Sequence, residues 1–295
     1  METKEENLKD NTPENKSGDK GYYYLYEMCK SIRNDSHSAS GYLNPITNRL
    51  RDIMETLSLE GVTFRFIPFH THNENTFDKE SLKLANVMVD FKAKDSDETV
   101  IFTAHHDIAN SNSENCQDNT ASVCNLIDLC IRLKKLEQEG KLTKNISVGF
   151  TDCEEVGGRG MNQLIKEIKS GIYGDEENLT LYALELTAQG ENFWVSGILK
   201  DSEFHKEIKE KLNKEEVGVV GTPYNESVNA RRYGIKACCI GILDDVNMKS
   251  ALSRGYCDSW ALCHSLDDTF EKSADKESMN NFVQDLMKLA SVELN

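Results

Sequence analysis

Residues 100–107 read VIFTAHHD, and they decide the fold class because an apolar run ends abruptly in two histidines and an aspartate. The short apolar part, Val100 to Ala104, predicts a buried strand. Two later apolar runs end in the same way, one at Glu154 and Glu155 and the other at Glu185. Because the carboxyl ends of strands surround the ligand crevice in open α/β sheets, we expect these three clusters to share one site.

Strand-like and helix-like patterns alternate on both sides of this stretch. Short or alternating apolar runs predict strands at 62–69, 84–91, 100–104, 146–151, 179–186, 193–195 and 236–243. Apolar residues at three- and four-residue steps predict helices at 22–59, 123–133, 160–169, 203–212 and 276–294. The alternation indicates an α/β fold with a mixed or mostly parallel sheet that helices cover on both faces. No linker interrupts residues 21–295, which predicts a single domain.

The first twenty residues differ from the rest of the chain. They contain no aromatic residue and only one large aliphatic residue, Leu8. Such a segment cannot bury enough apolar surface to offset its conformational entropy, so we predict a disordered acidic tail over residues 1–20.

The composition disfavours several classes of partner. The formal net charge of -16 disfavours nucleic acid and anionic membranes, and it is compatible with a cationic group such as the free amine of a peptide. No stretch approaches 18 apolar residues, so we expect no transmembrane helix, and the polar N-terminus predicts neither a signal nor a transit peptide. Nine scattered cysteines without a Cys-x-x-Cys pair are typical of reduced thiols in a cytoplasmic protein. These observations leave the oligomeric state open.

Two histidines and three carboxylates form a chemically complete set for a metal centre: His105, Asp118, Glu155, Glu185 and His264. Taken alone, Asp118 is most simply a helix cap and His264 a loop histidine. Glu185 interrupts an apolar run, and a buried carboxylate is costly unless it is paired or coordinates a metal. Imidazole and carboxylate together suit zinc. If Asp118 bridges two ions, His105 and Glu185 can hold one of them. Glu155 and His264 can then hold the other, which leaves each ion an open position for water.

Two further carboxylates have expected roles in the chemistry. Glu154 and Glu155 are adjacent, so in an extended segment their side chains point in opposite directions and only one of them can be a ligand. The other is free to act as a general base on the attacking water. Asp107 lies two residues after His105 and can accept the second imidazole N–H, which fixes the tautomer of that ring.

The order of these residues resembles that of the two-zinc aminopeptidase family. This family contains leucyl aminopeptidases, glutamate carboxypeptidase II and, as a one-zinc branch, glutaminyl cyclases. Its pattern is His-x-Asp, Asp-Asn-x-x-Ser, Glu-Glu-x-Gly, a carboxylate after a strand, and a histidine before a final helix. The matching positions here are 105–107, 118–122, 154–157, Glu185 and 264–269, and the match runs from about Asn86 to the C-terminus.

The resemblance implies a single-domain three-layer sandwich of the zinc-peptidase fold, with a sheet of about eight strands. It also implies two zinc ions, Glu154 as the general base, and a peptide or amide substrate with a free α-amine. The gap from His105 to Asp118 is too short for an inserted domain. The chain departs from the family at Glu185, where aspartate is common, and around residues 227–229, where a Ser-Asp pair is usual.

Two other hypotheses stay open beside the aminopeptidase. A glutaminyl cyclase or another amide hydrolase would hold one zinc, although cyclases usually carry tryptophan where this chain has Cys263. A non-catalytic binding protein on the same fold would typically have lost metal ligands, whereas here all five positions and the base are filled. We therefore predict a zinc metallopeptidase that removes N-terminal residues from peptides.

Overall fold

The computed structural model describes residues 19–34, 48–71, 82–110 and 112–292. The predicted disordered tail therefore lies outside the described residues except for Asp19 and Lys20. The predicted helix over 22–59 corresponds to α2 (Lys20–Asn34) and α3 (Asn48–Leu59), and its part between these two helices lies outside the described residues as well.

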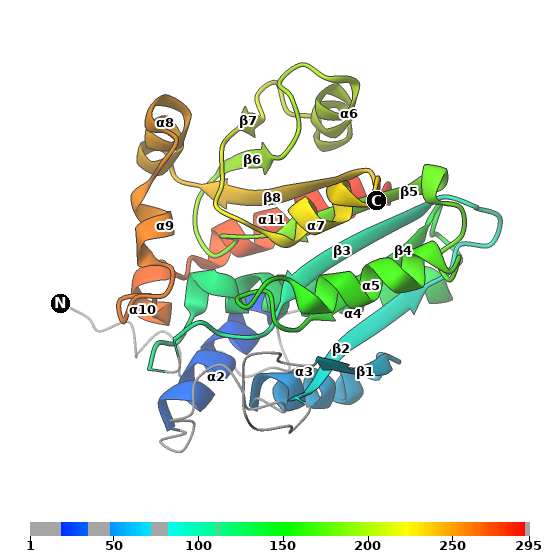
Figure 1. Cartoon of the computed structure of the whole chain (residues 1–295), viewed down its shortest axis with the longest axis horizontal. Coiled ribbons are helices and arrows are strands. Elements are labelled where there is room, and N and C mark those ends of the chain that lie inside the picture. Colours follow the sequence, from blue (N-terminus) through cyan, green and yellow to red (C-terminus); the bar gives the residue numbers. More distant parts are fainter. Residues whose placement is uncertain (1–18, 35–47, 72–81, 111, 293–295) are drawn as a thin grey trace.

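An eight-stranded mixed sheet forms the middle layer of the protein (Figure 1), and its strand order is β1-β2-β4-β3-β5-β8-β6-β7. The four central strands β4, β3, β5 and β8 run parallel to one another, whereas β2 and β6 pair antiparallel with their central neighbours. The bounds are β1 (Arg65–Thr71), β2 (Leu82–Phe91), β3 (Thr99–His105), β4 (Asn145–Thr151), β5 (Leu179–Leu184), β6 (Asn192–Ser196), β7 (Gly218–Val219) and β8 (Ala237–Leu243). The predicted α/β class and the sheet of about eight strands are confirmed.

Helices cover both faces of this sheet. On one face, α4 (Ala121–Gln138) and α11 (Lys276–Leu289) share the largest hydrophobic core with α2, α3 and α6 (Glu203–Leu212). On the other face, α5 (Arg159–Lys169) and α7 (Glu226–Arg232) bury a smaller core against β2, β3, β5 and β8. The central strands are buried over nearly their whole length, as their continuous apolar runs predict.

The sequence did not reveal the strand β7 or several short helices in the last third of the chain. These helices are α7, α8 (Asp245–Arg254), α9 (Asp258–Leu262) and α10 (Phe270–Ser273). The helices α7, α9 and α10 have four to seven residues, too few turns for a clear helical period. The helix α8 is as long as α6, but it buries only Met248 and Ala251 and so lacks an apolar stripe. Among the described helices, none has the length and apolar character needed to cross a membrane.

The start of α5 packs directly against the loop that follows β4. The Gly160 N–H donates to the carbonyl oxygen of Asp152 (2.8 Å), and Asn86 Nδ2 donates to the carbonyl oxygen of Gly160 (2.9 Å). Asn86 Oδ1 accepts from the Asp152 N–H at 3.1 Å. A Cβ atom on Gly160 would lie 2.5 Å from the backbone N and O of Asp152. Glycine at this position therefore lets the loop that carries Glu154 approach the helix.

We predict that Gly160→Ala lowers the free energy of unfolding by about 1–3 kcal/mol, because the new methyl group must displace backbone. Urea denaturation measures this change. Gly221→Ala is the matched control, since its added Cβ meets no atom within 4 Å, and we expect it to shift the value by less than about 1 kcal/mol. Equal stabilities for the two variants would contradict the close packing of α5.

Candidate metal centre

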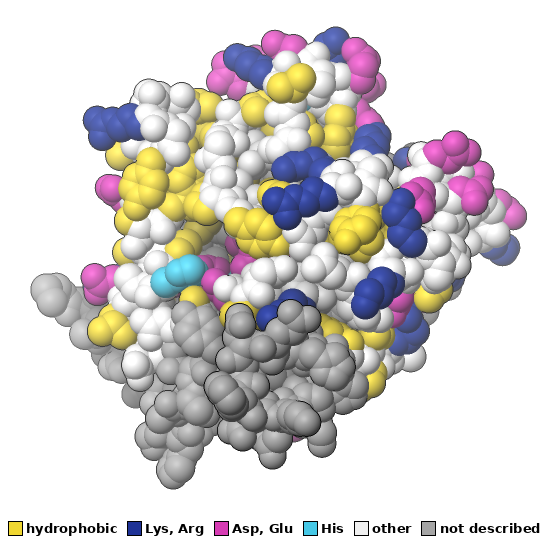
Figure 2. All heavy atoms as spheres, viewed as in Figure 1, with side chains coloured by type: hydrophobic (Ala, Val, Ile, Leu, Met, Phe, Trp, Pro, Cys, Tyr) yellow, Lys and Arg dark blue, Asp and Glu magenta, His cyan; other side chains and the backbone are white. Residues whose placement is uncertain are grey.

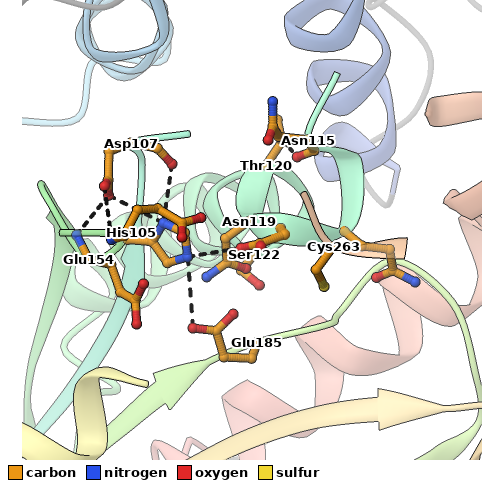
Figure 3. A network of polar contacts seen from close by, with 12 residues as sticks. His105, Asp107, Asn115, Asn119, Thr120, Ser122, Glu154, Glu185 and Cys263 are labelled. Atoms are coloured by element: carbon orange, nitrogen blue, oxygen red, sulfur yellow. Dashed lines mark hydrogen bonds and ion pairs between the residues drawn. The ribbon is translucent and has the colours of Figure 1, made fainter. Parts of the chain in front are cut away.

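Three neighbouring parallel strands deliver the first group of site residues. His105 is the last residue of β3, and Glu185 directly follows β5. Glu154 and Glu155 lie in the turn that follows β4. Because β4, β3 and β5 are adjacent and parallel, their carboxyl ends meet at the same edge of the sheet. Figure 3 shows the side chains of His105, Glu154 and Glu185 directed toward a common space.

Asp118 lies between two histidines from distant parts of the chain. Its Oδ1 is 3.2 Å from Nε2 of His105, and its Oδ2 is 3.0 Å from Nε2 of His264. The Asp118 backbone is extended (φ −121°, ψ 85°), and the peptide bond to Asn119 is cis. The helix α4 begins only at Ala121, and no side chain caps its first turn. Asp118 therefore does not cap α4, the role that it would have if taken alone, and its two carboxylate oxygens face the two histidines instead.

The remaining two predicted ligands complete the two sides of this arrangement. Glu155 Oε2 is 3.0 Å from Nε2 of His264, so these residues lie beside Oδ2 of Asp118. Glu185 Oε1 is 3.8 Å from Nε2 of His105, so this pair lies beside Oδ1 of Asp118. The structure thus places the five predicted ligand residues together, with Asp118 in the middle.

Asp107 holds both the imidazole of His105 and the turn after β4. Its Oδ1 is 3.3 Å from Nδ1 of His105. The backbone N–H groups of Glu154 and Glu155 donate to Oδ1 and Oδ2 of Asp107 at 3.0 and 3.1 Å. One carboxylate therefore orients a proposed ligand and fixes the backbone of the two glutamates.

The electrostatics show that carboxylates outnumber positive groups in this site. Burial raises the pKa of Glu154 to about 8 and that of Glu155 to about 7, and burial also raises the pKa of Glu185 well above its usual range. The hydrogen bond that the imidazole of His264 donates to the carboxylate of Asp118 raises the pKa of His264 to about 9. Burial opposes the charge of His105, yet Asp107 and Asp118 raise its pKa well above the ordinary value. These glutamates can therefore be fully ionised at neutral pH only when the site holds more positive charge than the two imidazoles supply.

The donor atoms fit a metal ion. One ligand atom each from His105, Asp118 and Glu155 lies within 4.8 Å of the others, a spacing that a single cation can bridge. Glu155 Oε1 is buried and has no hydrogen-bond partner among the described residues. Histidine nitrogen and carboxylate oxygen are the donors that zinc accepts in catalytic sites.

A pocket of about 450 Å³ opens at this centre. Figure 2 shows a hollow in this face, with acidic and hydrophobic side chains along it and a histidine at its edge. His264, with 56% of its side chain exposed, lies at the solvent-facing side. Sequence reasoning missed the apolar wall of the pocket, which is formed by Leu186, Pro223, Trp260 and Cys263. Only the position of Leu186 next to Glu185 gave a local signal for this role.

Tyr224 also lines the pocket, and its hydroxyl donates to Asn229 Oδ1 at 2.8 Å. Sequence reasoning also missed Glu226 and Asp268. Both carboxylates are buried, Glu226 at the start of α7 and Asp268 four residues after His264. Neither residue stood out because acidic residues are frequent throughout this chain.

Comparisons with known proteins point to one family. The model of peptidase family M28 matches residues 86–235. A search of curated protein sequences finds no match. A zinc aminopeptidase from Bacillus subtilis aligns with a TM-score of 0.68 at 10% identity, covering 92% of this chain and 94% of that chain. A glutaminyl cyclase from Porphyromonas gingivalis aligns with a TM-score of 0.65 at 15% identity, covering 93% and 97% of the two chains. The LapA aminopeptidase of Legionella pneumophila gives 0.66 at 14% identity, with 100% and 76% covered.

We predict that His264→Ala weakens the binding of one ion, because the substitution removes a candidate ligand that lies beside Glu155 and Oδ2 of Asp118. Metal analysis after dialysis, together with titration of the metal-free protein, measures the stoichiometry and affinity of zinc binding. Leu266→Ala alters an exposed residue of the same loop and serves as the control. Unchanged stoichiometry and affinity in His264→Ala would remove this histidine from the metal centre.

Proposed function

The chain belongs to peptidase family M28, and from this we propose that it is a zinc-dependent aminopeptidase that removes N-terminal residues from peptides and uses two ions. The observation that carries this proposal is the position of Asp118, whose two carboxylate oxygens each approach a different histidine. A single carboxylate in that position can serve two ions at once.

The proposed ligands divide into two sets that share Asp118. His105 and Glu185 would hold one ion through the side of Oδ1. His264 and Glu155 would hold the other through the side of Oδ2. Three protein ligands for each ion would leave a position open for water, as catalytic zinc requires. When bound, such paired ions supply Lewis acidity that polarises the substrate carbonyl and makes water nucleophilic at neutral pH.

Glu154 is the proposed general base. Its carboxylate lines the pocket, and its raised pKa of about 8 suits a group that takes and returns a proton near neutral pH. Glu154 would accept a proton from the attacking water and then transfer it to the nitrogen of the leaving amine. Asp107 supports this role because it accepts the Glu154 N–H and also holds Nδ1 of His105, so that Nε2 faces the centre.

The lining of the pocket supports a peptide substrate. Leu186 and Trp260 lie beside the proposed metal centre and provide an apolar wall for the first side chain of the peptide. The pocket volume of about 450 Å³ suits one amino-acid residue and part of the next.

The state of the cysteines supports a location in a reducing compartment such as the cytoplasm. All nine are free thiols in the structure, and eight of them are buried. Burial raises the pKa of several of these thiols, including Cys130 and Cys239, which keeps them protonated and unreactive.

We predict that Glu154→Gln retains the fold and the bound metal but loses turnover by about a hundredfold or more, the usual scale for loss of a general base. Initial rates on aminoacyl chromogenic substrates at saturating zinc measure this loss. The control is Glu210→Gln on the exposed side of α6, which should keep the wild-type rate. Full activity in Glu154→Gln would remove this residue from the mechanism.

The substrate class has its own test. We expect hydrolysis of aminoacyl substrates with a free α-amine, loss of this hydrolysis with a chelator, and recovery on addition of zinc. N-acetylated analogues should be poor substrates, because they lack the charged amine. Cyclisation of N-terminal glutamine with about one bound zinc would instead identify a glutaminyl cyclase.

A further inference from the structure

Two loops that are far apart in the sequence meet behind the metal centre. The Asp118 loop comprises residues 112–120 and leads into α4. The His264 loop comprises residues 263–269 and connects α9 to α10. About 150 residues separate these loops along the chain, so no local interaction sets the distance between Asp118 and His264.

The carboxylate of Asp268 connects the two loops. Its Oδ1 accepts the Gln117 N–H at 2.7 Å, and its Oδ2 accepts the Asp118 N–H at 3.2 Å. The Asp268 side chain is fully buried, with 0% exposed. Two buried N–H groups of the Asp118 loop therefore depend on one carboxylate of the His264 loop.

Further hydrogen bonds join the same loops. The carbonyl oxygen of Asp268 accepts from Ser113 Oγ at 3.3 Å and from the Cys116 N–H at 3.5 Å. Beside the site, Asn110 Nδ2 donates to the carbonyl oxygen of His264 at 3.0 Å. The loops are thus tied both at Asp268 and at the backbone of His264 itself.

We propose that Asp268, assisted by Asn110, is a positioning residue that fixes Asp118 relative to His264 and so builds the shared metal ligand in advance. This inference rests on the proposed two-ion centre. Asp268 does not line the pocket, and its carboxylate reaches the Asp118 loop through the backbone N–H groups of Gln117 and Asp118.

The choice of aspartate at position 268 follows from this geometry. A carboxylate can accept two N–H groups, one at each oxygen, whereas an asparagine amide offers one oxygen and directs its own N–H groups at the second donor. Substitution by asparagine therefore frees the Asp118 backbone. Because Asp118 is shared between the two proposed ions, the loss of its fixed position lowers the affinity for both ions rather than for one.

The test compares Asp268→Asn with Asp267→Asn. Asp267 is the adjacent aspartate, but it is 66% exposed and pairs with Lys272 at 2.5 Å, so it provides a matched control. Zinc affinity of the purified full chain is measured by competition with a chromophoric chelator, well below the unfolding temperature. The visible spectrum of the cobalt-loaded protein reports ligand geometry independently of activity. We expect about a 10- to 100-fold loss of affinity for both ions in Asp268→Asn, an altered cobalt spectrum, and no change in Asp267→Asn.

A lower thermal midpoint with unchanged zinc affinity and cobalt spectrum would show a merely structural role and overturn the inference. If Asp268→Asn does not fold, Asn110→Ala is the variant to test, because it removes the hydrogen bond to the His264 carbonyl oxygen at a less buried position. Wild-type zinc affinity in Asn110→Ala would overturn the inference. If the wild-type chain binds two zinc ions but hydrolyses no peptide, the proposed aminopeptidase activity is refuted. The comparison of zinc affinities between Asp268→Asn and Asp267→Asn still tests the positioning role of Asp268. A wild-type chain that binds no zinc would refute both.

Discussion

The site depends on one carboxylate, Asp118, that is shared between two imidazoles. Its oxygens lie 3.2 and 3.0 Å from Nε2 of His105 and Nε2 of His264, and each histidine has one glutamate of its own nearby. Burying this many carboxylates is unfavourable unless positive charge compensates them. Membership of peptidase family M28 gives this electrostatic demand a chemical explanation, since zinc supplies the missing charge.

Two carboxylates stabilise this arrangement in the same way, because each accepts two successive backbone N–H groups. Asp107 accepts the successive N–H groups of Glu154 and Glu155, and Asp268 accepts those of Gln117 and Asp118. In each case a carboxylate outside the proposed ligand set fixes the backbone from which a proposed ligand or general base projects. Rigid support of this kind reduces the cost of ordering the ligands when an ion binds.

Glu185 has one methylene more than aspartate, and the site accommodates this longer side chain. Family members commonly carry aspartate there, and the longer side chain still brings Oε1 to 3.8 Å from Nε2 of His105. This contact is longer than the 3.0 Å between Glu155 and His264, so the two halves of the centre are not equivalent. Leu186, the next residue along the chain, belongs to the apolar wall of the same pocket.

Local sequence patterns determined the strands β3, β4 and β5 and the residues at their ends, because the burial of a central strand is encoded in a short apolar run. Motif order then grouped His105, Asp118, Glu155, Glu185 and His264. Local patterns alone left Asp118 as a simple helix cap, and only the motif order predicted it as a shared ligand. Local patterns also left α7 to α10 unseen, because α7, α9 and α10 are very short and α8 buries only Met248 and Ala251. Asp267 and Asp268 are identical neighbours in the sequence, yet one is exposed and the other is fully buried. Only the tertiary structure decided between them, because the partners of Asp268 lie about 150 residues away and no local pattern encodes a contact over that distance.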